Sequence, residues 1–202
     1  MTLVGERKAL AAIALAFFAV LFALNGLLGP SPFAPMFLGL AACYVVAFFS
    51  LVAGYFWGRW FAMGLAFSGL MSAGLMAWQI GFSPIVWFWG GLHGIVALAL
   101  MGRGPQSIFD GRADWRERYR MDEDAVVRLG KSVRRAGTSL PYLIMAGLAP
   151  RQSLALVALC ALGLAVAGLW ALVGTRAWAL LALAGSALLA GSLATVSTYT
   201  FA

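Results

Sequence analysis

Long runs of residues without a charged side chain are the feature that most constrains this sequence. Fifty residues without a charge separate Lys8 from Arg59, and forty-three more separate Arg59 from Arg103. A further twenty-four lie between Arg151 and Arg176, and twenty-six follow Arg176. A membrane-spanning helix needs about 20 apolar residues at a rise of about 1.5 Å each. The first two runs are therefore long enough for two spans each, and the last two for one each.

The composition excludes the other broad classes of protein. Hydrophobic residues make up 63% of the 202 residues and charged residues only 10%. Soluble domains have about 45–50% apolar and about 25% charged residues, and disordered chains are still more polar. We therefore predict an all-α integral membrane protein.

Turn residues divide the two long runs. Gly29-Pro30-Ser31-Pro32 interrupts the first, and Gly81-Phe82-Ser83-Pro84 interrupts the second. Proline ends a helix because it lacks an amide hydrogen and clashes with the preceding turn. The resulting prediction is a bundle of six transmembrane helices, over residues 9–28, 36–56, 62–80, 84–102, 152–174 and 177–199. The chain then has a four-helix transmembrane part (1–102), a cytoplasmic or interfacial loop (103–150) and a two-helix transmembrane part (151–202).

The positions of lysine and arginine predict the orientation. If the N-terminus is cytoplasmic, thirteen of the 14 basic residues lie on the cytoplasmic side and only Arg176 lies outside. This bias is typical of a bacterial-type inner membrane protein, and it predicts that both termini are cytoplasmic. Because the net charge of +7 resides in this signal and in the loop, we expect no nucleic-acid partner. Tryptophans near the predicted helix ends suggest aromatic belts at both interfaces: Trp57, Trp60, Trp78, Trp87, Trp89, Trp170 and Trp178.

The loop contains a predicted basic amphipathic helix that begins near Asp122, where acidic residues suit a helix N-terminus. We expect Gly137 and Pro141 to end it, and residues 141–149 to form an interfacial or re-entrant segment. Its apolar stripe, with 3-4 spacing, is Val126, Leu129, Val133, Ala136 and Leu140. Its basic face is Arg128, Lys131 and Arg135, with Arg134 at the flank.

Two interpretations of this amphipathic helix remain open. The stripe could lie in the cytoplasmic leaflet with the basic residues on anionic headgroups, or it could bind a partner protein. We favour the leaflet, because a five-residue seam is short for a coiled coil. Trp115 and Tyr119, which precede the helix, are assigned to the same docking surface.

His93 is the one ionisable side chain of the predicted spans that calls for an explanation, since no Asp, Glu, Lys or Arg lies inside them. This pattern argues against ion pumps, voltage sensors and intramembrane acid–base catalysis. We expect a neutral histidine, hydrogen-bonded to a neighbouring helix, level with Ser72 and near Ser68. The glycine and serine spacing of Gly64, Ser68 and Ser72 is typical of a helix–helix contact in membranes. The alternatives are a gate in a polar path, a quinone contact or an axial haem ligand, and a haem would need its second ligand from a partner subunit.

The expected function follows from these features. We predict a non-catalytic membrane subunit that packs against other membrane proteins or a second copy of itself and docks at its basic cytoplasmic face. One alternative is a small channel or carrier for a neutral or hydrophobic solute, lined by His93, Ser72 and Ser68. The other is a haem- or quinone-binding subunit that uses His93. Neither a metal ion nor a resident cofactor is otherwise predicted.

Overall fold

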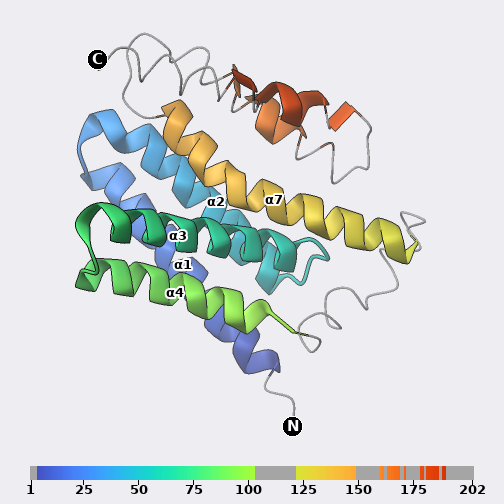
Figure 1. The fold of residues 1–202 in the computed structure, drawn as a ribbon, viewed down its shortest axis with the longest axis horizontal. Coiled ribbons are helices and arrows are strands. Elements are labelled where there is room, and N and C mark those ends of the chain that lie inside the picture. The colour runs from blue at the N-terminus through green and yellow to red at the C-terminus, as the bar shows by residue number, and fades with distance from the viewer. Residues whose placement is uncertain are drawn as a thin grey trace. The chain divides into compact units, whose positions relative to one another are not determined.

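The computed structural model is all-α, and it describes residues 4–102 and 122–148, together with parts of 160–189 (Figure 1). Its helices are α1 (Val4–Leu28), α2 (Ala34–Val52), α3 (Gly58–Ile80), α4 (Pro84–Leu100) and α7 (Glu123–Leu148), with a short 3-10 turn, η1 (Ser31–Phe33), before α2. Three segments are long and apolar enough to cross a membrane, Gly5–Leu28, Ser31–Val52 and Gly58–Ile80, and the apolar helix Pro84–Leu100 is shorter. The protein is therefore a multi-pass membrane protein.

The first four helices lie where the charge-free runs and turns predict them. Each begins and ends within five residues of the predicted bounds. Gly81 ends α3 with a φ of 75°, a left-handed conformation that glycine adopts without strain. The predicted spans 152–174 and 177–199 lie largely outside the described residues, so the count of six spans stays a prediction.

The chain divides into two compact units, and α1, α2 and α7 each pass from one to the other. The first unit comprises residues 1–20 and 43–139, and the second comprises 21–42 and 140–202. In the first, α3 and α4 form an antiparallel hairpin whose fully buried side chains include Leu65, Val96 and Leu100. In the second, the rings of Phe22 and Phe37 stack with centroids 6.3 Å apart.

Helix α7 differs from its prediction at its C-terminal end. Its N-terminus is as expected, because an Asp122 carboxylate oxygen accepts a hydrogen bond of 2.6 Å from the amide of Ala125. The helix does not end at Pro141, however, but continues to Leu148, so the expected interfacial segment is helical. Because Pro141 has no amide hydrogen, the helix lacks one backbone hydrogen bond at this position. The buried residues on either side of it, Leu140 and Ile144, show that packing continues through the proline.

The apolar stripe of α7 packs inside the protein rather than in the lipid leaflet that we favoured. Its five members are between 4% and 7% exposed. Two glycines on the same face explain this close approach, because Gly130 and Gly137 are seven residues, or nearly two turns, apart. A Cβ at Gly130 would lie 2.8 Å from the Trp60 ring, and one at Gly137 would lie 3.2 Å from the Cα of Gly64. The backbones of α3 and α7 are therefore in contact.

Candidate functional site

His93 lies at the centre of the first unit and is the most buried ionisable side chain described. It is 1% exposed. Its Nε2 lies 2.8 Å from the Tyr44 hydroxyl on α2, and its Nδ1 lies 2.8 Å from the carbonyl oxygen of Trp89, one turn earlier in α4. Both ring nitrogens are thus within hydrogen-bond distance of groups of the chain itself. The expected hydrogen bond to a neighbouring helix is present, and the neighbour is α2.

The acceptor at Trp89 fixes the tautomer of a neutral His93 ring. A carbonyl oxygen can only accept, so the proton is on Nδ1, which donates to it. Nε2 then has a lone pair and accepts from the Tyr44 hydroxyl. The ring needs no further donor or acceptor, which satisfies the general requirement that buried polar groups be paired.

Two aromatic rings that also contact each other, Phe18 and Trp89, pack against the His93 ring. The Phe18 ring of α1 lies with its centroid 4.1 Å away, and the Trp89 ring lies 5.1 Å away. On α3 the ring meets Gly69, where a Cβ would overlap the imidazole atoms. Side chains or backbone from all four helices α1–α4 therefore meet at His93, and the arrangement holds the helices together.

The contact with α3 differs from the expected one by about a turn. Gly69, not Ser72, meets the ring, because the pairing of Gly69 with His93 centres the hairpin on residue 81, whereas Ser72 would require a turn centred between residues 82 and 83. Ser68 is 2% exposed and Ser72 is half-buried. Gly64, the first residue of the same spacing, contacts α7 instead.

Basic side chains bind the carbonyl groups at the C-terminal end of α4, an arrangement that the sequence reasoning did not predict. Arg59 is only 7% exposed, and its Nε donates to the carbonyl of Leu100 at 2.9 Å. Arg7 donates to the carbonyls of Leu98 and Met101 at 2.5 and 2.7 Å. The last carbonyls of a helix have no partners within it and carry a partial negative charge. The signal was available, since both arginines flank apolar helices at the predicted cytoplasmic face.

Lys8 does the same at the end of α2. Its Nζ donates to the carbonyl of Val52 at 3.0 Å. Arg7, Lys8 and Arg59, three of the cations from which the orientation is predicted, therefore also bind the ends of helices.

The basic face of α7 is placed as predicted on the exposed side of the helix. Arg128, Lys131 and Arg135 are exposed, and Arg134 is half-buried at the flank. A single ion pair is described here, at 4.0 Å between Arg128 and Asp122, both largely solvated. Trp115 and Tyr119, assigned to the same surface, lie outside the described residues.

Two tryptophans depart from the expected aromatic belts. Trp60 is 6% exposed and packs against Gly130 of α7, and the Trp89 ring packs against His93. Trp78 and Trp87, by contrast, are 88% and 67% exposed at the end of the α3–α4 hairpin, as a belt requires.

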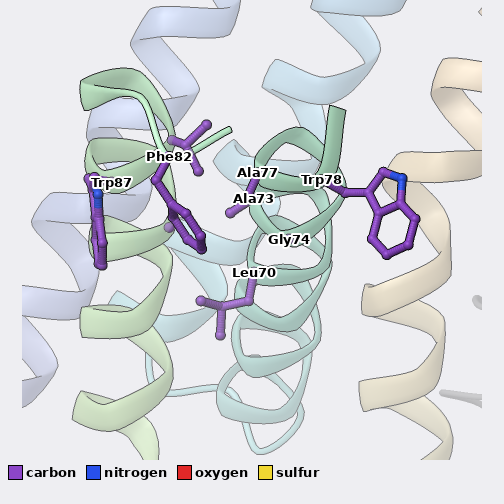
Figure 2. A pocket seen from close by; sticks show the side chains of 10 residues that line it. Leu70, Ala73, Gly74, Ala77, Trp78, Phe82 and Trp87 are labelled. Atoms are coloured by element: carbon purple, nitrogen blue, oxygen red, sulfur yellow. The ribbon is translucent and has the colours of Figure 1, made fainter. Parts of the chain in front are cut away.

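A cavity of about 590 Å³ lies between α3 and α4 at this end of the hairpin. In Figure 2, Phe82 lies over the space between the helices, and Trp78 and Trp87 point outward on its two sides. The lining is apolar, and it includes neither His93 nor either of the two serines. Ligand pockets need a few polar groups to orient what they bind, and the polar side-chain groups of this lining are limited to the indole N–H groups of Trp78 and Trp87.

Comparisons with known proteins give no family. No protein-family model, no curated protein and no solved structure matches the chain.

Proposed function

We propose that this protein is a non-catalytic subunit of a membrane complex and that it binds an acidic partner through the basic face of α7. The proposal rests on the contrast between polar side chains that are buried and bonded within the chain and basic side chains that are exposed. His93 and Arg59, which are buried, bond to groups of the chain itself. Lys131 and Arg135 are exposed and have no acidic partner among the described residues. Because the stripe of α7 is already buried inside the protein, the basic face is the side of this helix left for a partner.

The proposed setting is a bacterial-type inner membrane, with the N-terminus and the basic face in the cytoplasm. The accumulation of lysine and arginine at that side of the first four spans supports it. The same positive charge attracts anionic headgroups, at about 1 kcal/mol for each basic residue near the surface. Headgroup contact and partner binding therefore have to be separated by experiment.

The two alternatives gain no support from the geometry. A polar path through His93, Ser68 and Ser72 would need space at the imidazole, where Phe18 and Gly69 lie against the ring. A haem iron or a quinone would have to displace the Tyr44 hydroxyl from Nε2.

Affinity purification in mild detergent tests the docking proposal. The variants are Lys131→Gln/Arg135→Gln, which loses both charges, and the control Lys131→Arg/Arg135→Lys, which keeps them. We expect the wild type and the control to retain the same partner and the glutamine variant to lose it. The complex should also dissociate at 1 M salt, where the screening length falls to about 3 Å.

An unchanged set of partners in the glutamine variant would contradict the proposal. So would a variant that loses only its binding to vesicles of anionic phospholipid, because that result would assign the basic face to headgroups.

A further inference from the structure

We propose that α7 crosses the membrane as an additional span, so that the chain after Leu148 continues on the outer side. The proposal concerns α7 beyond the basic face and does not depend on what that face binds. It rests on where the two ends of α7 lie along its neighbours in each unit.

The N-terminal part of α7 begins beside the cytoplasmic end of α3. Gly130 meets Trp60, two residues after the start of α3, and Gly137 meets Phe61 and Gly64 further along. Contacts therefore advance in the same direction on both helices. Figure 1 shows this parallel course over the first part of α7. A helix lying flat on the membrane surface would instead cross a spanning helix at a steep angle.

The C-terminal part of α7 lies beside the opposite end of α2. In the second unit, a Cβ at Gly39 would lie 2.9 Å from Ile144 and 3.2 Å from Leu148. Gly39 is five residues from the start of α2, about 7.5 Å along its axis. That start follows the α1–α2 turn, whereas α3 begins after the α2–α3 turn at the other end of α2. The two ends of α7 thus lie near opposite ends of spanning helices.

The length of α7 suits a short span. It has 26 residues, or about 39 Å. Fifteen residues without a charge lie between Arg135 and Arg151, and the thirteen of them that belong to α7 extend about 20 Å. This is less than the hydrocarbon thickness of about 30 Å, and arginine side chains at both ends can extend to the headgroups to make up the difference.

The distribution of basic residues fits this topology as well as it fits the six-span one. With α7 inserted, six predicted spans become seven, and the two C-terminal spans reverse. Arg151 then lies outside and Arg176 inside. Thirteen of the 14 basic residues remain cytoplasmic, so the charge bias does not distinguish the two topologies.

Cysteine labelling of the full chain tests the crossing. Cys43 and Cys160 are replaced by alanine, and single cysteines are placed at Asp124, Arg151 and, as an outer reference, Ser31. A membrane-impermeant maleimide is applied to right-side-out and to inside-out vesicles. We expect Arg151→Cys, like the reference Ser31→Cys, to react with the maleimide from the outer side. Asp124→Cys should react with it only from the cytoplasmic side. Reaction of Arg151→Cys from the cytoplasmic side, or from neither side, would overturn the proposal.

Discussion

A histidine buried among apolar helices has to satisfy two ring nitrogens, and this requirement determines the neighbours of His93. One nitrogen uses a carbonyl of its own helix, and the other uses the Tyr44 hydroxyl on α2. The hydroxyl is the single polar side-chain group described at the ring, so each partner depends on the other. The role assigned to His93 is therefore structural.

Removal of the hydroxyl should destabilise the fold. We expect Tyr44→Phe and His93→Leu each to lower the free energy of unfolding by about 1 kcal/mol, the scale of an intramembrane hydrogen bond. Because both variants remove the same bond, the double variant should cost less than their sum. His93→Gln, which keeps a donor and an acceptor, should be tolerated. Thermal unfolding in detergent measures all four, and strictly additive losses would show that the two side chains are not coupled.

Gly69 provides a second test of the same site. A methyl group there would overlap the imidazole, and a ring held by two hydrogen bonds cannot easily move away. We expect Gly69→Ala to destabilise by about 1–3 kcal/mol, the range for an overpacked core. Gly74→Ala on the same helix is the control, since its Cβ would meet nothing within 4 Å. The control should be neutral or stabilising, because alanine favours helix over glycine. Equal effects of the two substitutions would count against the packing described.

At the scale of the elements, close packing decides the position of α7. Its amphipathic pattern is the same whether the stripe faces lipid or another helix. The spacing of Gly130 and Gly137 is the signal that favours packing against another helix over contact with lipid. Two glycines on the apolar face leave no side chain there that would keep a neighbouring helix at a distance.

Substitution at this seam should separate the two helices. In Gly137→Val the added atoms would collide with the Phe61 carbonyl, 2.7 Å from where the Cβ would lie. We expect a loss of about 1–3 kcal/mol. Exposed Lys131→Ala, on the other face of α7, should change stability by less than about 0.5 kcal/mol. Chemical denaturation of the two variants in mixed micelles compares them, and a tolerated valine would mean that α3 and α7 do not touch at this position.

The end of α4 gives a further prediction at this scale. Arg59→Gln removes a buried donor from the Leu100 carbonyl. The expected loss is about 1–3 kcal/mol, because the carbonyl is left without that donor. Arg135→Gln removes the same charge from an exposed position and should be nearly neutral. The melting temperatures of the two variants measure this difference. Equal decreases in melting temperature would show that Arg59 stabilises the protein only through its charge.

At the scale of the whole molecule, the elements near the N-terminus were predictable and their contacts were not. The helices α1–α4 follow from local properties, which are charge-free length and proline and glycine turns, and the start of α7 follows from its acidic residues. The partner of His93 depends on how four helices pack, and nothing in the neighbourhood of Tyr44 in the sequence marks it as that partner. Likewise, Pro141 is a sound local signal for a helix end, and it was wrong because buried contacts on both sides outweigh one lost hydrogen bond.

The central claim is that α7 belongs to the helix bundle and does not lie on the membrane surface, since both the exposed basic face and the proposed crossing follow from it. Spin labels placed singly along residues 124–140 of the purified protein in vesicles test this directly. We predict that labels at Leu129 and Val133 are protected from both lipid-soluble oxygen and an aqueous quencher, while labels at Arg128 and Lys131 are open to the quencher. A stripe fully accessible to oxygen would place α7 on the lipid surface and contradict the account.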